Sequence, residues 1–275
     1  FKAPSVTLTD SPTANLVPSA HLELSLDYLK SRGFTRTSIY SNGKIELVGS
    51  KELELTPGSE LLLSGAAVDI SRSVFAPGGK ILLATEAIDS RVSLLDPQQR
   101  QSITIADGVS LDVSSKLSND LATATQPSII AIDGGEIDID VTAVNGELKV
   151  GNNVRLAADA GAWLAQDGSV TTGSGGNLRI AAGGPGVALE TGRGLQLSAY
   201  GFDTGGSLEL VANQIRVTGT GPSFDTRRRH DPLADPGLPY IVSSSLFDNG
   251  GFADISLVAT GATLNTSSGV LDPLT

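Results

Sequence analysis

The feature that most constrains this chain is a Gly-Gly pair followed each time by a run that alternates aliphatic and polar residues. A pair followed by such a run occurs five times, beginning at positions 78, 134, 175, 205 and 250. Glycine accepts the backbone conformations of a tight corner, including positive φ, and a period of two sends alternate side chains to one face of a β-strand. In the third copy, Leu178 and Ile180 share such a face. Each pair therefore predicts a corner that leads into a strand.

One short unit of this kind cannot bury its apolar face alone, so the copies are expected to stack on one another. The residues before the first pair carry further alternating runs, with turns predicted at Asn42-Gly43 and Pro57-Gly58. Ile45, Leu61 and Ile81 are interpreted as corresponding positions, and they recur at an interval typical of one turn of a three-sided β-solenoid. The sequence predicts an all-β solenoid of about 12 to 14 coils.

The Gly-Gly pairs recur at unequal intervals, so loops must interrupt the coils. Proline-rich and charge-rich stretches predict loops or excursions over residues 10–20, 89–101 and 219–240. The repetition favours one rod over two compact domains, and residues 1–275 are expected to form a single solenoid rod segment. The chain contains no Met and begins at Phe1, and we interpret it as a fragment of a much longer polypeptide.

The composition suits a narrow aliphatic interior, because hydrophobic residues make up 40% of the chain and aromatic residues only 4%. A β-solenoid packs its sheets about 10 Å apart, where large rings seldom fit. The absence of cysteine excludes disulfides, thiolate metal sites and cysteine nucleophiles. The net charge of −11 repels phosphate backbones, so no nucleic-acid partner is expected.

Two segments carry a resemblance to a known family: GFTRTSIYSNGKIELVGSKELELTPGSELLLSGAAVDI (residues 33–70) and LSAYGFDTGGSLELVANQI (residues 197–215). Their cadence resembles the repeat regions of filamentous-haemagglutinin-like large exoproteins, over most of residues 33–262. The resemblance implies a right-handed parallel β-helix with extra-helical loops. It also implies two-partner secretion by an outer-membrane partner transporter, acting through a part of the parent chain outside this sequence. The expected location is secreted, extracellular or on the cell surface of a Gram-negative bacterium.

The acidic set Glu136, Asp138 and Asp140 is the best enzyme candidate, because the aliphatic residues between them point inward and leave three carboxylates on one outer strand face. Clefts of β-helical polysaccharide lyases and hydrolases gather such acids. A solvated face that blocks edge pairing is the alternative, and calcium bridging between coils is a third, weaker interpretation. The two histidines, His21 and His230, cannot form a multi-histidine metal site. No enzymatic activity and no cofactor is expected.

The ligand-binding candidates are Arg227, Arg228, Arg229 and His230, which form a basic cluster in an acidic chain. Guanidinium groups match sulfate and carboxylate oxygens, which favours a sulfated or acidic glycan. A charged loop paired with its neighbouring aspartates is the alternative. The lone tryptophan, Trp163, is interpreted either as a sugar-stacking residue or as a buried packing residue.

The resemblance, together with the predicted solenoid, implies a secreted, surface-associated adhesin or filament segment, a β-helical stalk that extends and displays binding regions for attachment to cells or surfaces. The expected partners are a cell-surface glycan or protein receptor and neighbouring rods. Two alternatives stay open. One is a polysaccharide lyase or glycoside hydrolase on a β-helix, and the other is a purely structural filament module with no ligand of its own.

Overall fold

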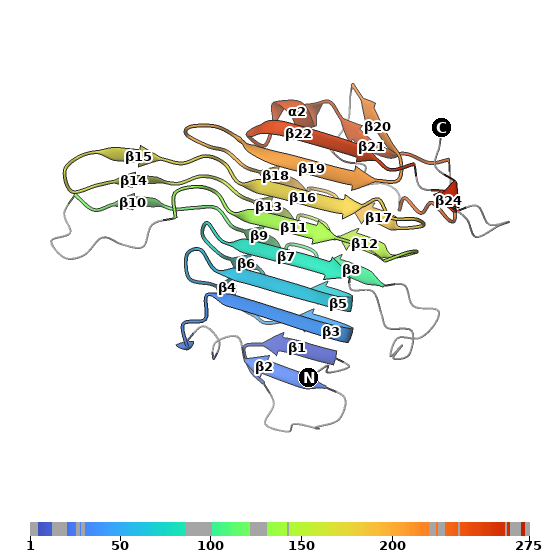
Figure 1. Cartoon of the computed structure of the whole chain (residues 1–275), viewed down its shortest axis with the longest axis horizontal. Helices are drawn as coiled ribbons and strands as arrows, with labels where there is room; N and C mark the ends of the chain where they lie inside the picture. Colours follow the sequence, from blue (N-terminus) through green and yellow to red (C-terminus); the bar gives the residue numbers. More distant parts are fainter. Residues whose placement is uncertain are drawn as a thin grey trace.

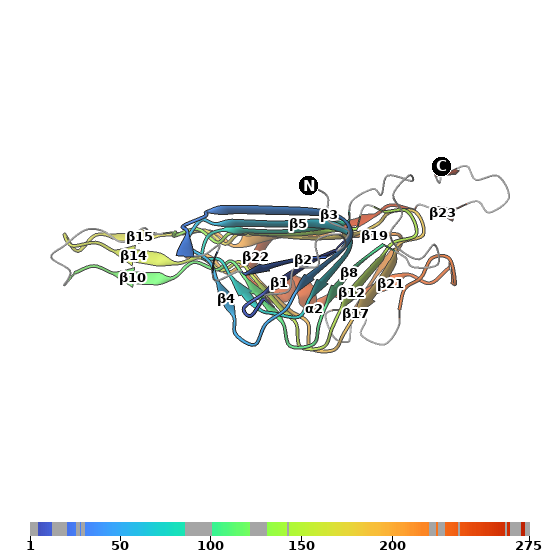
Figure 2. The same cartoon turned by 90° about the horizontal axis from the view of Figure 1, so that it is seen from below.

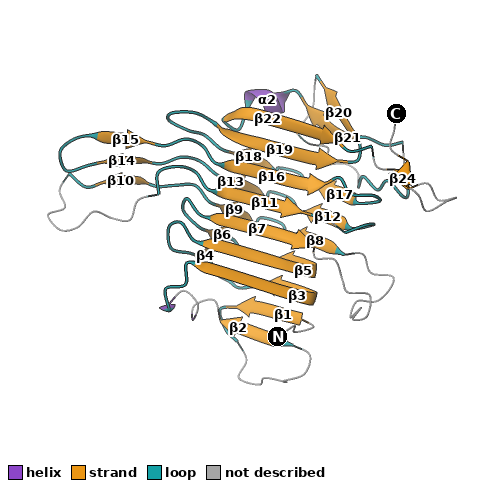
Figure 3. Cartoon of the chain, in the orientation of Figure 1, coloured by secondary structure: helices purple, strands orange, loops and turns teal. Residues whose placement is uncertain are grey.

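The computed structural model describes residues 5–12, 21–25, 28, 31–85, 101–121, 131–141, 143–219, 224, 229–235, 237–261, 263–264 and 271–272 (Figure 1). Figure 3 shows a chain built almost entirely of strands, with the short helix α2 (Ser245–Asp248) near its C-terminal end. The strands are β1 (Ser5–Thr9), β2 (Leu22–Ser25), β3 (Arg36–Leu47), β4 (Leu53–Glu54), β5 (Glu60–Ile70), β6 (Val74–Phe75), β7 (Lys80–Thr85), β8 (Ser102–Ile105), β9 (Ser110–Asp112), β10 (Leu117–Asn119), β11 (Glu136–Asp140), β12 (Glu147–Val150), β13 (Arg155–Ala157), β14 (Ala162–Leu164), β15 (Val170–Thr172), β16 (Asn177–Ala182), β17 (Ala188–Thr191), β18 (Gln196–Ser198), β19 (Gly206–Ala212), β20 (Ile215–Thr218), β21 (Tyr240–Ser243), β22 (Phe252–Ala259), β23 (Thr263–Leu264) and β24 (Leu271–Asp272). Among the described residues, no helix is long and apolar enough to cross a membrane.

The strands form three faces. The largest sheet has 12 strands, and its strand pairs are parallel. It has two faces because β3 and β5 bend midway: residues 60–65 of β5 pair with β7, and residues 67–70 pair with β8. A separate five-stranded parallel sheet forms the third face. Figure 2 looks roughly along the stacking direction and shows the faces as sides of a triangle.

Successive strands on each face come from successive passages of the chain, and we call one passage through the three faces a layer. The first face has the order β3-β5-β7-β11-β16-β19-β22, the second has β2-β1-β3-β5-β8-β12-β17, and the third has β4-β6-β9-β13-β18. Apart from β2 and β1, strand order on a face follows chain order. The fold is therefore an all-β stack of layers joined by long parallel sheets.

Aliphatic side chains stack in register through the layers and form the core. One ladder on the first face consists of Leu61, Ile81, Ile137, Leu178, Leu208 and Ile255, and a second ladder of Leu63, Leu83, Ile139, Ile180, Leu210 and Leu257. All are buried except the last member of each, which is half-buried at the end of the stack. The predicted inward face of β16 is thus confirmed. Burying one such side chain contributes about 1.5–3 kcal/mol, so the ladders hold the layers together.

Each of these five Gly-Gly pairs leads into a strand of the first face, as predicted, but positive φ occurs only in the first and last of them. The middle pairs contain glycine because the backbones of neighbouring layers touch at this corner. A Cβ on Gly176 would lie 1.9 Å from the carbonyl oxygen of Gly135, and a Cβ on Gly135 would lie 2.0 Å from that of Gly79. The corner therefore excludes any side chain.

The predicted correspondence of Ile45 with Leu61 is wrong. Ile45 pairs with Val68 of β5, whereas Leu61 pairs with Ile81 as predicted. The reason is that Asn42-Gly43 does not separate two strands. It lies at a register shift within β3, where that strand bends from the first face to the second.

The predicted 12 to 14 coils are too many, since the first face contains seven strands among the described residues. Glu60, Lys80 and Glu136 occupy the same position in three successive strands of the first face. The chain between Lys80 and Glu136 is far longer than the chain between Glu60 and Lys80. Segments outside the layers use the remaining residues. Of the predicted loops, residues 13–20, 89–100, 220–223, 225–228 and 236 lie outside the described residues.

One excursion was not predicted. Strands β10, β14 and β15 form a three-stranded sheet that projects sideways from the stack as an arm (Figure 1). β10 leaves one layer after β9, and the antiparallel pair β14-β15 leaves the next layer after β13. Leu117 and Val170 on this arm are 72% and 63% exposed. The arm therefore presents apolar side chains to solvent.

Candidate functional site

The predicted acidic set lies on β11, and basic side chains of the adjacent layers hold all three carboxylates. Arg179 on β16 donates from Nη1 to Asp138 Oδ1 at 2.9 Å and to Asp140 Oδ2 at 2.6 Å. Its Nε donates to Glu209 Oε1 on β19 at 3.1 Å. Lys80 Nζ on β7 donates to Glu136 Oε2 at 2.6 Å. The acids thus bridge four layers on the outer side of the first face.

Burial raises the pKa of Asp138 above its ordinary value, and it outweighs the hydrogen bond from Arg179, which acts in the opposite direction. For Arg179 itself, burial lowers the pKa, but the hydrogen bonds to Asp140 and Asp138 outweigh burial and the net direction is upward. Structural ion-pair networks shift pKa values as active sites do. Because Asp138 is already bonded to a guanidinium, this arrangement fits an interlayer clamp better than an acid facing a substrate.

No group of three or more carboxylate or imidazole side chains that could hold a metal occurs within the described part of the chain. Glu136, Asp138 and Asp140 alternate with inward residues along one strand and point toward Lys80 and Arg179. The structure therefore directs the weak calcium candidates toward cations that the protein itself supplies.

The predicted basic cluster is divided. Arg227 and Arg228 lie outside the described residues, whereas Arg229 is anchored to the stack. Arg229 Nε lies 2.8 Å from Glu147 Oε1 on β12, and Nη1 lies 3.3 Å from Asp231 Oδ2. An internal ion pair thus occupies one guanidinium that was predicted to bind an external anion.

His230, the fourth predicted ligand, is buried, with 6% of its surface exposed. Its backbone exchanges hydrogen bonds with Leu189 of β17 at 2.8 and 2.9 Å, and its ring meets Tyr240 edge-on with centroids 5.0 Å apart. This segment covers the open edge of β17, so the prediction of His230 as a surface ligand is wrong. The physical reason is that an unpaired strand edge needs backbone partners.

Trp163 lies half-buried on β14 of the arm, so it is not the buried packing residue of the second interpretation. Its indole Nε1 donates to the buried carboxylate Asp120 at 2.9 Å. The bond joins β14 to the end of β10, so Trp163 braces the arm.

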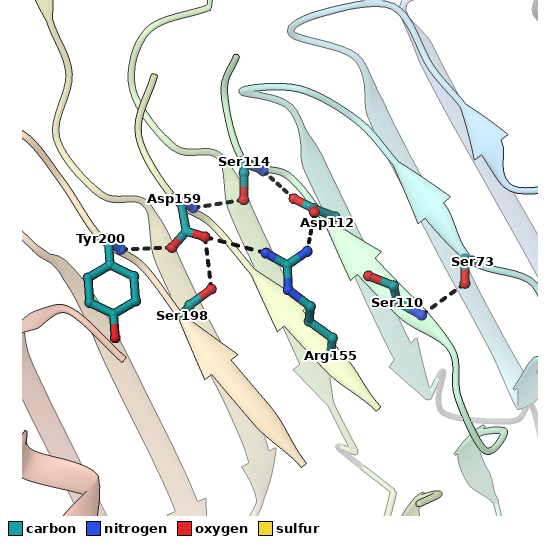
Figure 4. Close-up of polar contacts among 8 residues, drawn as sticks. All are labelled: Ser73, Ser110, Asp112, Ser114, Arg155, Asp159, Ser198 and Tyr200. Carbon is teal, nitrogen blue, oxygen red and sulfur yellow. Dashed lines mark hydrogen bonds and ion pairs between the residues drawn. The ribbon is translucent and has the colours of Figure 1, made fainter. Parts of the chain in front are cut away.

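A second polar network was not predicted and lies on the outer side of the third face (Figure 4). Arg155 on β13 contacts two carboxylates: Nη1 donates to Asp112 of β9, and Nη2 lies 3.4 Å from Asp159 Oδ2. Asp159 also accepts from Ser198 Oγ at 3.0 Å and from the backbone N–H of Tyr200 at 2.8 Å. The network connects three successive layers.

A sequence signal existed for the first network only. Arg179 and Glu209 stand at the same distance after their Gly-Gly pairs as Asp138 does, and the register places the three side by side. Arg155 and Asp112 follow no such marker, and loops of unequal length separate their strands. Aligning the repeats could have found the clamp but not the Arg155 network.

Comparisons with protein-family models, with curated proteins and with solved structures return no match for this chain.

Proposed function

We propose that this chain is a right-handed parallel β-helix and an internal segment of a secreted surface adhesin, in which it extends and displays binding regions. Three faces of parallel strands, filled by aliphatic ladders in register, support the β-helix. The resemblance of residues 33–70 and 197–215 to filamentous-haemagglutinin-like exoproteins supports the right-handed sense. It also supports export through an outer-membrane partner transporter to the outside of a Gram-negative cell.

The observation that carries the display role is the constancy of register across layers of very different length. Glu136 pairs with Lys80 in the preceding layer and with Asn177 in the following layer. The register of neither strand pair shifts, although the two intervening stretches of chain differ in length. Extra residues leave the stack as excursions such as the arm. A scaffold that tolerates insertions in this way suits the presentation of binding segments.

In this proposal the chain has no catalytic activity of its own. The candidate acids are already held by Arg179 and Lys80, which leaves them poorly placed to act on a glycosidic bond. The lyase or hydrolase alternative predicts new reducing ends or unsaturated products from a panel of acidic and neutral polysaccharides. Product formation that disappears in Asp138→Ala protein would overturn the proposal.

Attachment is the direct test of the display role. Beads carrying the protein should adhere to cultured cells or polysaccharide-coated surfaces more often than beads carrying an equally acidic globular protein. A variant with residues 225–228 replaced by Gly and Ser keeps the buried Phe224 and every ladder residue, and asks whether that segment contributes. If native beads attach no better than the acidic control, the purely structural filament module becomes the better description.

A further inference from the structure

A groove of about 320 Å³ lies beside the Arg155 network, where the third face ends. Its walls are strand β18, helix α2 with the following Asn249 and Gly250, and the side chains of Arg155, Tyr200 and Phe224. Pockets that bind small ligands span about 300–1,000 Å³. The groove therefore has room for a small ligand and is lined by both apolar and polar groups.

One wall is a partly open strand edge, where the N–H of Ala199, just after β18, already donates to Gly250 O at 2.7 Å. β18 is the last strand of the five-stranded sheet. The Gln196 N–H donates to Val154 O, and Ser198 O accepts from the Ala158 N–H, so both residues are bonded toward β13. Backbone groups of alternate residues in a strand point to opposite edges. The N–H and C=O of Leu197, which lines the groove, therefore point toward it, and Gly250 lies beside the carbonyl oxygen.

A second wall is the aromatic ring of Tyr200, whose backbone and hydroxyl group are both fixed by hydrogen bonds. The backbone N–H of Tyr200 donates to Asp159, and the hydroxyl of Tyr200 accepts from the Gly250 N–H at 3.2 Å. The backbone of Gly251 packs so closely on the ring that an added Cβ would lie 2.3 Å from Tyr200 Cδ1. The residue is nonetheless 56% exposed. Tyr200 is thus a fixed apolar surface open to a ligand.

The groove carries no net positive charge. Arg155 brings one positive charge, but Asp112 and Asp159 both contact its guanidinium. Its Nε–H and the exposed amide of Gln196 have no hydrogen-bond partner among the described residues. The groove therefore offers neutral donors and acceptors and no net attraction for an anion, in a chain of net charge −11.

From these contacts we infer that the groove binds a short neutral saccharide. The apolar face of a sugar ring fits against Tyr200, because aromatic rings combine large apolar area with little loss of side-chain freedom. Its hydroxyl groups both donate and accept, which matches the Gln196 amide and the Leu197 backbone. An extended peptide is the other class of occupant, but β18 offers it only three residues of edge. The inference does not rest on the proposed display role, since the groove could bind saccharide in any setting.

The test is isothermal titration calorimetry of the full chain with tetrasaccharides of glucose, mannose, galactose and xylose, and with tetragalacturonate as the anionic comparison. At least one neutral tetrasaccharide should bind with Kd below about 10 mM. Tyr200→Ala and Gln196→Ala should each weaken that binding about tenfold or more. Tyr200→Phe keeps the ring and should bind within about threefold of the native protein. Tyr40→Ala, which removes another exposed tyrosine at a distant layer on β3, is the matched control and should change nothing.

The salt dependence of the Kd distinguishes this site from one that binds its ligand by charge. The Kd for the neutral probe should change by less than about twofold between about 50 and 500 mM NaCl, because no charge is recognised. The inference is overturned if no neutral tetrasaccharide binds, if binding survives unchanged in both Tyr200→Ala and Gln196→Ala, or if tetragalacturonate binds preferentially and is released by salt. None of these outcomes contradicts the display role, which the bead assay tests separately.

Discussion

Replacing Gly176 by Ala would force two layers apart at the corner where the Gly-Gly pairs stack. The new Cβ would lie 1.9 Å from the carbonyl oxygen of Gly135, whereas ordinary contact begins at 3.4 Å, so the approach is too close by about 1.5 Å. Both sides are fixed by backbone hydrogen bonds. Asn177 N–H donates to Gly135 O at 2.9 Å, and Gly176 N–H donates to Ala158 O at 2.7 Å. Relief of the contact therefore disrupts the bonds that join the layers.

The magnitude follows from these contacts. Overpacking costs about 1–3 kcal/mol, and leaving buried backbone groups unsatisfied costs about 1–3 kcal/mol more. We expect Gly176→Ala to lower the free energy of unfolding by about 3–5 kcal/mol, measured by urea denaturation followed by circular dichroism. Gly219→Ala is the matched control, because nothing lies within 4 Å of its added Cβ. It should change stability by less than about 0.5 kcal/mol.

The reasoning also predicts where the damage lies. Layers contact mainly their neighbours, so amide hydrogen exchange in Gly176→Ala protein should accelerate first in β11 and β16, which flank the corner. If Gly176→Ala and Gly219→Ala unfold at the same urea concentration, close approach does not explain the glycines. Uniform acceleration of exchange along the whole stack would contradict the localisation.

Two further predictions concern β11. Ile139→Asp places a charge in the ladder between Leu83 and Ile180, and should lower the free energy of unfolding by about 3–5 kcal/mol. The outward change Asp138→Asn should lower it by less than about 1 kcal/mol at pH 7. Denaturation midpoints in the reverse order would refute the face assignment. Because burial raises the folded-state pKa of Asp138, its contribution is fully present below the unfolded value of 3.8 and is lost as pH rises through the raised pKa. The stability of the native protein relative to Asp138→Asn should therefore fall from pH 3 toward pH 7 in urea titrations, and a flat or rising difference would contradict this sign.

The sequence predicted best where a local rule controls the outcome. Alternation placed Leu178 and Ile180 inward because a strand has a strict period of two. Neither the Arg155 network nor the arm could be predicted, because both depend on which strands of unequal layers become neighbours. His230 shows the same limit: its place in a basic cluster on a predicted loop made it a ligand candidate, but its backbone pairs with the edge of β17 and its ring is buried.

The position of the arm indicates how such a scaffold acquires new surface. β10 and β14-β15 leave successive layers at the same corner, between the third face and the first, and this shared exit lets β10 and β14 pair in parallel. In the following layer a short loop at this corner still contacts the arm, since the N–H groups of Phe202 and Asp203 both donate to Gly173 O. An insertion at this corner thus finds a partner in the layer beside it and keeps its backbone hydrogen-bonded without entering the core. The ladders need only the strand residues to stay in register, so excursions can lengthen here while the stack remains the same.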